Sequence, residues 1–323
     1  MKVFVTRRIP EEGIKLLERE CDEVEVYSFD RIPSKNEIIE GLKGKDGLLC
    51  LLTDRIDRDV ISSNPKLRVI SNYAAGYDNI DVDEATKRGI VVTNTPDVLT
   101  NATAELAWAL LFAVARRVVE GDKFTREGKF RGWSPTLLLG KELAGKTLGV
   151  VGAGRIGTAF ALKAKCFDMK VLYFNRSRNE VLEDRLGAKK VDLEELLRES
   201  DIVSIHLPLT KETYHLIDYE KICMMKRDAI IVNTARGAII NEKDLVRALS
   251  EGRIFGAGLD VYEKEPEITE ELKKLDNVVL LPHIGSATLE TRREMAILAA
   301  ENLIKVLKDE KPKYCVNPEV LKG

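Results

Sequence analysis

The chain has 323 residues, more than a single hydrophobic core usually serves, so two domains are the first expectation. Its 51 lysines and arginines nearly balance its 53 aspartates and glutamates, and the formal net charge is -2. This balance gives no overall attraction to nucleic acid or to an anionic membrane surface, so a small-molecule partner is favoured.

Targeting and cysteine signals are weak. No apolar run approaches the roughly 18 residues of a membrane span, and residues 1–6 begin a strand rather than a signal segment. We therefore expect a cytoplasmic protein with no membrane partner. The 5 cysteines lack C-x-x-C spacing, which disfavours both a disulfide framework and a zinc site.

Residues 1–90 alternate short apolar runs with amphipathic segments. The predicted strands cover 3–5, 24–26, 47–52 and 69–70, and the predicted helices cover 11–19 and 36–42. Repeated strand-then-helix units predict a parallel sheet with helices on both faces.

A long helix is predicted over residues 101–120, where apolar residues recur at helical spacing after the turn signal Thr95-Pro96-Asp97. The strand-like runs that follow are 148–151, 171–174, 202–205, 229–232, 255–259 and 278–281. A second long helix is predicted over 289–307, followed by an extended tail at 315–318. If the tail returns to the first domain, the chain crosses between domains near residues 98 and 287.

The motif Gly152-Ala153-Gly154-Arg155-Ile156-Gly157 follows the apolar run 147–151 and precedes a helix-like segment. A buried strand, a tight turn and a helix start place backbone N–H groups and a positive dipole end beneath a pyrophosphate. The motif therefore predicts dinucleotide binding, and a turn without a ligand is the alternative.

The fold class follows from these elements: an α/β chain with two doubly wound parallel-sheet domains. We expect residues 99–287 to form a Rossmann cofactor domain. Residues 1–98 and 288–323 then form a flavodoxin-like substrate domain.

Three chemically active residues each come just past a buried strand: Arg236, Glu265 and His283. Singly, such an arginine is usually a surface ion pair and such a glutamate a solvated loop residue. Together they suit reduction of a ketone, because a histidine beside a carboxylate donates a proton to the forming alkoxide. Arg236 can hold a substrate carboxylate by a two-pronged, charge-assisted pair. This combination selects 2-oxo acids.

The other two histidines do not suggest a metal site. His206 falls in the apolar strand run 202–207, and His215 falls in a following helical segment. No carboxylate or thiolate spacing supports metal binding, so we expect none.

Over essentially its whole length the chain resembles the D-isomer-specific 2-hydroxyacid dehydrogenases, and among them most the glyoxylate/hydroxypyruvate reductases. The matching segments are 72–81, 94–100, 152–157, 233–237, 258–266 and 281–287. The resemblance implies reduction of glyoxylate or hydroxypyruvate to the D-2-hydroxy acid by NAD(P)H. It also implies that Arg236 binds substrate, that Glu265 orients and charges His283, and that His283 is the acid/base. Reduction should then fade as pH rises, because it needs His283 protonated.

The resemblance implies further contacts. The backbone of Ala75 and Gly76 binds the substrate carboxylate and Leu52 lines the pocket, although a glycine turn and plain core packing are the alternatives. Asp260 holds the nicotinamide amide. The expected cofactor-binding residues are Gly152, Ala153, Gly154, Arg155, Ile156, Gly157, Asn175, Arg176, Ser177, Thr234, Ala235, Asp260 and Gly285.

Trp133 lies in a loop of small and polar residues. It either anchors its own loop or, as the resemblance implies, reaches the substrate pocket of a partner subunit. The second reading predicts a homodimer that pairs through the cofactor domains.

The cofactor preference is read at the end of the strand 171–174, where an NAD-binding domain usually carries Asp or Glu. Here the strand runs into Asn175-Arg176-Ser177-Arg178, whose guanidinium and hydroxyl groups suit a 2′-phosphate. We predict NADP(H) over NAD(H), with NAD(H) still possible. The alternative is that the arginines face solvent.

Other functions remain open. D-3-phosphoglycerate dehydrogenases share the three catalytic residues but commonly prefer NAD, and other D-2-hydroxyacid dehydrogenases take other small 2-oxo acids. Formate has no carbonyl to protonate, so the intact Glu265 and His283 weigh against a formate dehydrogenase. Dehydrogenase-like corepressors use the fold as a nicotinamide-sensing binding module, and turnover distinguishes them.

Overall fold

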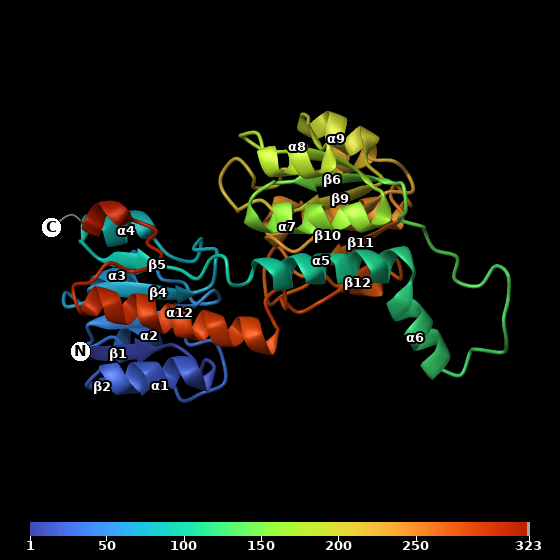
Figure 1. Ribbon diagram of the computed structural model, residues 1–323. Helices are drawn as coiled ribbons and strands as arrows, with labels where there is room; N and C mark the ends of the chain where they lie inside the picture. Colours follow the sequence, from blue (N-terminus) through green and yellow to red (C-terminus); the bar gives the residue numbers. More distant parts are fainter. Residues whose placement is uncertain (322–323) are drawn as a thin grey trace. The chain divides into compact units, whose positions relative to one another are not determined.

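The computed structural model describes residues 1–321, which form two units that each contain one parallel β-sheet (Figure 1). One unit comprises Met1–Leu99 and Ser286–Gly323, and the other comprises Thr100–Gly285. The predicted fold class is therefore confirmed.

The first unit has a five-stranded sheet in the order β2-β1-β3-β4-β5, with every neighbouring pair parallel. This is the flavodoxin-like order. The elements are β1 (Lys2–Val5), α1 (Glu11–Glu20), β2 (Glu23–Val26), α2 (Lys35–Gly41), β3 (Gly47–Leu51), α3 (Arg58–Ser62), β4 (Val69–Tyr73), α4 (Val82–Lys87), β5 (Val91–Thr93), α12 (Leu289–Leu307) and the 3₁₀ helix η4 (Pro318–Leu321).

Helices cover both faces of this sheet, so its central strands read as continuous apolar runs. α12 packs beside α1 and against β4, and the other face buries residues of α2, α3 and α4. The segment before η4 lies along the sheet edge, where the Val316 amide donates to the Val92 carbonyl at 2.8 Å.

The second unit has a seven-stranded parallel sheet in the order β12-β11-β10-β9-β6-β7-β8, a Rossmann order with one added strand. Its helices are α5 (Thr100–Ala115), α6 (Val118–Arg126), α7 (Arg155–Lys163), α8 (Glu180–Leu186), α9 (Leu193–Glu199), α10 (Tyr219–Met224) and α11 (Glu242–Ser250). Its strands are β6 (Thr147–Val151), β7 (Lys170–Phe174), β8 (Lys189–Lys190), β9 (Ile202–Ile205), β10 (Ile230–Asn233), β11 (Gly256–Leu259) and β12 (Val278–Leu280). Short 3₁₀ turns are η1 (Ala164–Phe167), η2 (Gly237–Ile239) and η3 (Leu272–Lys274).

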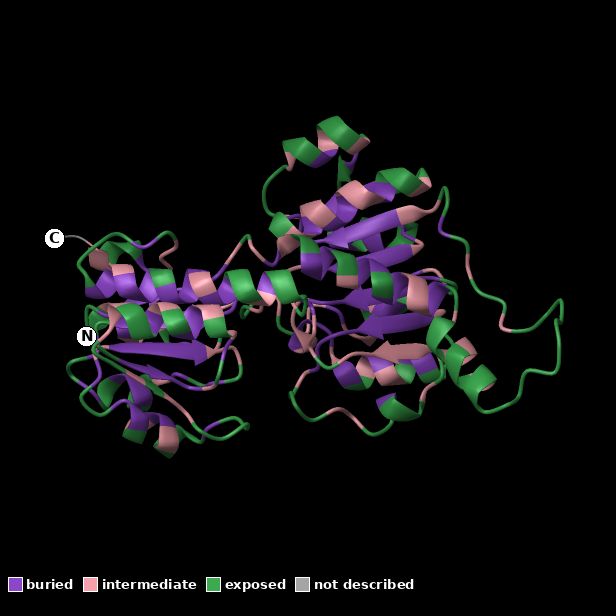
Figure 2. Cartoon of the chain, turned by 60° about the horizontal axis from the view of Figure 1, so that its bottom comes forward, coloured by how far each residue is buried: buried purple, intermediate pink, exposed green. Residues whose placement is uncertain are grey.

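Two apolar cores cover the faces of this sheet, and its central strands are buried throughout (Figure 2). α5 and α7 contribute to one core, whereas α9, α10 and α11 contribute to the other. Functional side chains therefore have to stand at the strand ends and in the loops.

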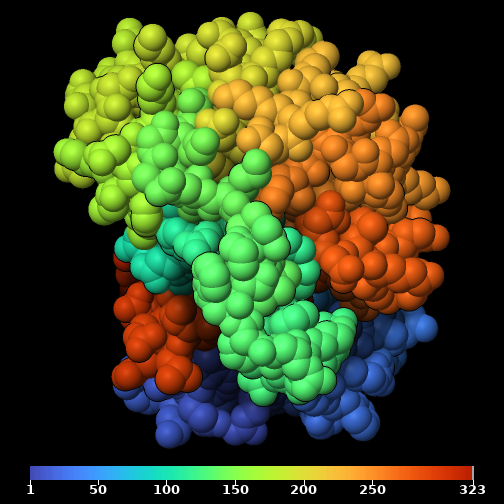
Figure 3. Space-filling model, turned by 90° about the vertical axis from the view of Figure 1, so that its right-hand side faces the viewer, coloured from blue at the N-terminus to red at the C-terminus, as the bar shows by residue number. Residues whose placement is uncertain are grey.

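The helix predicted over 101–120 is two helices, α5 and α6, in the structure. Arg117 has a left-handed backbone with φ of 52°, and the Ala115 carbonyl accepts from the Lys141 amide at 2.7 Å. This carbonyl is therefore used by a distant segment, and the chain turns before α6 begins. We call the segment 127–142 the arm. Both α6 and the arm lie at the surface of the unit (Figure 3).

Within residues 1–321, no helix combines the length and apolar character that crossing a membrane requires.

Candidate active site

The three chemically active residues follow three neighbouring strands. Arg236 follows β10, Glu265 follows β11 and His283 follows β12, and these strands pair in the order β10-β11-β12. Because the strands are parallel, their carboxyl ends lie at one edge of the sheet. In open α/β sheets this edge is where ligands bind.

Glu265 and His283 are in direct contact, with Oε2 of the glutamate 2.7 Å from Nδ1 of the histidine. Their side chains are 29% and 24% exposed, so the pair is partly screened from water and still reachable. With Nδ1 bonded to the carboxylate, Nε2 is the nitrogen left for proton exchange with a substrate.

Further hydrogen bonds join the two loops that carry this pair. Asp260 Oδ1 accepts from the Ile284 amide at 2.7 Å, and the Tyr262 hydroxyl donates to the Leu281 carbonyl at 2.8 Å. The Tyr262 amide also donates to Oε1 of Glu265 at 3.0 Å. Both carboxylate oxygens of the glutamate thus have a hydrogen-bond partner, and these bonds fix the position of one loop against the other.

Arg236 lies half-buried in a short loop that its own sequence stabilises. The Asn233 side chain donates to the Arg236 carbonyl at 2.9 Å and accepts from the Ala235 amide at 3.0 Å. The guanidinium in turn donates to the Ala235 carbonyl at 2.8 Å. Asn233 therefore fixes the turn that presents the arginine at the strand end.

The glycine motif forms a tight strand-to-helix turn between β6 and α7. Gly152 has φ of +100°, and a Cβ there would lie 2.8 Å from the His206 backbone. A Cβ on Gly157 would lie 2.0 Å from the Gly152 carbonyl oxygen, whereas one on Gly154 would meet nothing within 4 Å. The first and third glycines are thus required by protein packing, and the second leaves open space next to the backbone.

This turn lies at the topological switch point of the sheet, because β6 pairs with β7 on one side and with β9 on the other. Ala153 is buried, Ile156 is half-buried and Arg155 is exposed at the start of α7. The residues present fit a dinucleotide pyrophosphate, which needs a helix N-terminus and an uncrowded backbone.

Asp260 is fully buried, and its Oδ2 has no hydrogen-bond partner in the described chain. Burial raises the pKa of this carboxyl above its ordinary value. A buried acceptor without a donor is costly, and a carboxamide N–H would satisfy it. Gly285 lies beside it, since a Cβ there would be 3.2 Å from Oδ2, and the buried Thr234 hydroxyl likewise lacks a partner among residues 1–321.

The segment after β7 is exposed and locally ordered. Asn175 donates to the Ser177 carbonyl at 3.1 Å, and Lys190 donates to the Arg176 carbonyl at 2.9 Å. Arg178 instead pairs with Glu183, its Nε lying 3.1 Å from Oε2. Of the two arginines, Arg176 is the one that stays at the surface without this carboxylate.

The predicted substrate contacts Leu52, Ala75 and Gly76 lie in the first unit, after β3 and β4. Asn94 donates to the Ala75 carbonyl at 2.7 Å, and Asn72 donates to the Gly76 carbonyl at 2.8 Å. These side chains fix the backbone of the turn and occupy its carbonyl groups.

A buried carboxylate that the sequence did not reveal supports the neighbouring loop. Asp54 accepts from the Leu51 amide at 2.7 Å and from the Thr6 hydroxyl at 2.5 Å. Burial raises the pKa of Asp54. The loop that carries Leu52 is therefore anchored at both sides.

The remaining histidines have structural surroundings. Burial lowers the pKa of His206 to about 3, and its Nε2 lies 2.8 Å from the Ser204 hydroxyl. His215 is not helical as expected: it has φ of 50° in a turn and lies 3.2 Å from Glu263. Among the described residues no group of His, Cys, Asp and Glu could hold a metal ion.

Comparison with known proteins gives consistent results. Residues 108–285 match the family model described as D-isomer specific 2-hydroxyacid dehydrogenase, NAD binding domain. The chain is 53% identical to a glyoxylate reductase of Thermococcus litoralis, an alignment that covers 99% of this chain and 98% of that protein.

Solved structures agree. A glyoxylate reductase from Paecilomyes thermophila is 34% identical with a TM-score of 0.88, and 99% of each chain is covered. An NADPH-dependent glyoxylate/hydroxypyruvate reductase from Sinorhizobium meliloti, solved with NADP and malonate, is 30% identical with a TM-score of 0.87; 98% of this chain and 96% of that one are covered.

Proposed function

The chain belongs to the D-isomer specific 2-hydroxyacid dehydrogenase family and is an NAD(P)-dependent oxidoreductase, and on that premise we propose that it reduces glyoxylate and hydroxypyruvate to the D-2-hydroxy acids. The observation that carries the proposal is the Glu265–His283 contact of 2.7 Å beside the buried, unpartnered Oδ2 of Asp260. On this proposal His283 is the proton donor and Asp260 accepts from the nicotinamide carboxamide, and the two residues lie on adjoining loops.

The mechanism follows from these side chains. When bound, the reduced nicotinamide supplies the hydride for the carbonyl carbon. His283 gives its Nε2 proton to the carbonyl oxygen, so that hydride and proton together convert C=O to CH–OH. Glu265 stabilises the protonated imidazole and fixes its orientation. Arg236 binds the substrate carboxylate and polarises the neighbouring carbonyl.

We also propose that the turn at Ala75 and Gly76 in the first unit binds the substrate carboxylate. The Asn72 and Asn94 contacts occupy the carbonyls of Gly76 and Ala75, which leaves the amides of this turn to bind a carboxylate. Leu52 supplies an apolar wall. A small 2-oxo acid fits these two protein features, because its anionic end suits the amides and its short other end suits the apolar wall.

We further propose NADP(H) as the preferred cofactor, with NAD(H) as a possible second. Arg176 is exposed after β7, next to the Asn175 and Ser177 turn, where a 2′-phosphate would need a cation. No carboxylate stands at the end of the strand to repel that phosphate.

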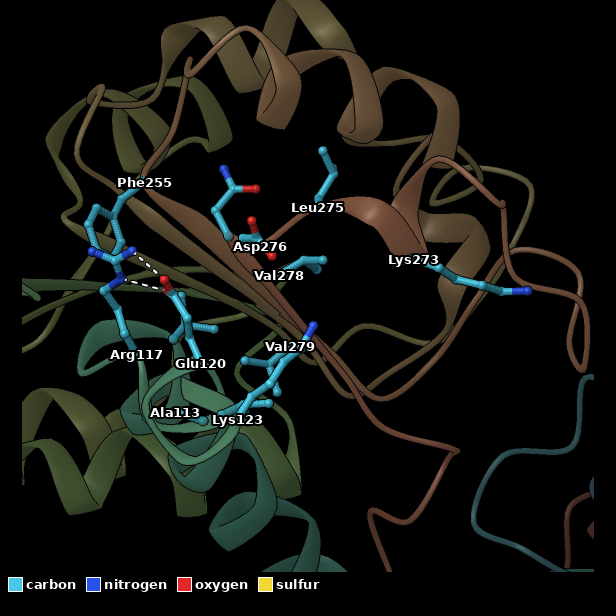
Figure 4. A pocket seen from close by; sticks show the side chains of 13 residues that line it. Ala113, Arg117, Glu120, Lys123, Phe255, Lys273, Leu275, Asp276, Val278 and Val279 are labelled. Atoms are coloured by element: carbon cyan, nitrogen blue, oxygen red, sulfur yellow. Dashed lines mark hydrogen bonds and ion pairs between the residues drawn. The ribbon is translucent and has the colours of Figure 1, made fainter. Parts of the chain in front are cut away.

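A homodimer is also proposed, formed through the second unit. The arm exposes Phe130, Trp133 and Leu139, with Trp133 85% exposed. A cavity of about 410 Å³ lies along the edge strand β12, and its lining is mixed, with apolar Phe255 and Val278 beside charged Lys123 (Figure 4). The exposed apolar side chains of the arm favour burial against a second copy of this chain.

The experiment is the initial rate of reduced-cofactor oxidation with glyoxylate and with hydroxypyruvate, each with NADPH and with NADH. We expect turnover of both acids with NADPH, and loss of at least about 100-fold in His283→Ala. Tight cofactor binding without turnover of either acid would contradict the proposed substrate and favour another 2-oxo acid or a binding module. Turnover with NADH alone would contradict only the cofactor preference.

A further inference from the structure

We propose that Glu242 is a positioning residue for the catalytic pair: its carboxylate holds the segment 263–269 at both ends and thereby sets Glu265 against His283. The kinetic part of this inference rests on the proposed function, and its structural part does not.

Glu242 is the first residue of α11, on a helix that bears no predicted active-site residue. It is 7% exposed, and its carboxylate accepts from the Glu263 amide at 3.0 Å and from the Thr269 amide at 3.1 Å. The Thr269 hydroxyl is a third donor to it. A buried carboxylate is costly unless it is hydrogen-bonded, and here the donors come from two points on one loop.

These two points bracket Glu265, which lies two residues after the first and four before the second. We call these bonds from Glu242 to the segment 263–269 the clamp. The segment also bonds back to the helix, because the Glu242 amide donates to Oε2 of Glu263 at 3.3 Å. The other oxygen of Glu263 lies 3.2 Å from Nε2 of His215. The loop is therefore fixed from α11 and from the turn before α10, while its far side joins the His283 loop through Tyr262.

A backbone held at only one end would let the Glu265 side chain move relative to the imidazole. Misplacing a catalytic group by about 1 Å can cost on the order of 100-fold in rate. We therefore expect Glu242→Ala to lower kcat for reduction about 10- to 100-fold, while KM for NADPH changes less than about 3-fold.

Two chemical readouts separate positioning from loss of stability. The charged groups facing His283 in the second unit include Glu265 and Asp260, so a displaced Glu265 favours the protonated imidazole less. The pH at which reduction falls to half should move lower in Glu242→Ala. A hydrogen bond to Glu265 should shift the NMR signal of the His283 Nδ1 proton downfield in the wild type. In Glu242→Ala this downfield signal should lose intensity. Histidine labelling makes it easy to assign, because the chain has 3 histidines.

Leu245→Ala is the matched control. Leu245 is buried on the same helix and packs in the apolar core, so its truncation destabilises the unit while every hydrogen bond from Glu242 to the loop is kept. We expect a lower unfolding temperature with an unchanged pH profile and an unchanged Nδ1 resonance. Glu242→Gln keeps one acceptor oxygen and should recover part of the kcat lost in Glu242→Ala.

If Glu242→Ala does not fold, Thr269→Val answers the question, because it removes one donor and keeps the shape of the side chain. It should shift the resonance and the pH profile in the same direction, by less. The proposal would be overturned if the folded Glu242 variants, or Thr269→Val, showed the same Nδ1 resonance and the same pH profile as the wild type. A wild type that turns over neither acid would refute the proposed function, and the resonance would still test the clamp.

Discussion

His283 combines two unusual features in one residue. Its backbone is left-handed with φ of 56°, a conformation that costs about 1–2 kcal/mol for a residue with a Cβ. The bonds on either side of it offset that cost, because Glu265 holds the ring and Asp260 holds the next amide. The geometry therefore holds the imidazole ring in one position, as the proposed role of proton donor requires.

At the residue scale, we predict that Arg176 sets the preference for NADP(H) over NAD(H). Replacing it with Asp removes a cation and adds a like charge to a 2′-phosphate. The loss of a charged hydrogen-bond partner costs about 1.5–3 kcal/mol, so the ratio of kcat/KM for NADPH to that for NADH should fall by roughly 10- to 100-fold. Steady-state kinetics with both cofactors measure it.

Arg178→Ala is the control for that prediction. It removes the same kind of charge two residues away, but this guanidinium is already paired with Glu183. Its cofactor ratio should change less than about 2-fold. If Arg176→Asp also leaves the ratio unchanged, Arg176 does not bind the phosphate.

Residues differ in how far the sequence reveals them. Arg236, Glu265 and His283 could be found because each is a charged or titratable residue in the loop after an apolar strand. Glu242 could not, because its partners are two backbone amides and a hydroxyl more than 20 residues away. Asp54 could not be found either, because its distinguishing feature is its burial, which only the folded structure shows.

At the scale of elements, the strand β6, the glycine turn and the helix α7 act together. Gly157 allows the helix to approach the Gly152 carbonyl, and Gly154 leaves the backbone uncovered. We therefore expect the two glycines to have separable roles, Gly157 in folding and Gly154 in the approach of the cofactor.

Substitutions test that separation. Gly157→Ala would push a Cβ to 2.0 Å from a carbonyl oxygen, so we expect a loss of about 1–3 kcal/mol or more in the free energy of unfolding. Gly154 has φ of -78°, which alanine adopts without strain. Gly154→Ala should leave unfolding without cofactor nearly unchanged and weaken NADPH binding about 10-fold or more.

Denaturant unfolding and cofactor titration of both variants decide the matter. Equal destabilisation in both would mean that the second glycine also serves packing. Undiminished NADPH affinity in Gly154→Ala would mean that the cofactor does not lie over this turn.

Elements differ in predictability for a physical reason. Strands buried on both faces, such as β3 and β10, and the long helix α12 could be predicted from apolar runs and periodicity. Short elements such as α3, α4 and β5 could not, because they carry few residues of pattern. The break between α5 and α6 escaped because its cause, the Lys141 contact, is remote in sequence.

For the whole molecule, the arm raises the question of assembly. Phe130 and Leu139 are 56% and 62% exposed, alongside the tryptophan, and burying such side chains contributes about 25 cal/mol per Å² of apolar surface. An isolated chain would leave this surface in water. In the proposed dimer a second chain covers it, and the tryptophan of one chain reaches the substrate of the other.

The proposed dimer leads to two separate predictions. Sedimentation tests the oligomeric state, and steady-state kinetics test the role of Trp133. The double variant Phe130→Asp with Leu139→Asp should shift the protein from dimer to monomer, because charges would be buried at the contact. Trp133→Ala should remain a dimer and raise KM for the 2-oxo acid about 10-fold, with KM for NADPH unchanged, because it removes one substrate contact. Phe29→Asp, an equally exposed aromatic change in the first unit, should alter neither property. A wild type that sediments as a monomer would refute the dimer, and an unchanged KM in Trp133→Ala would limit the tryptophan to anchoring the arm.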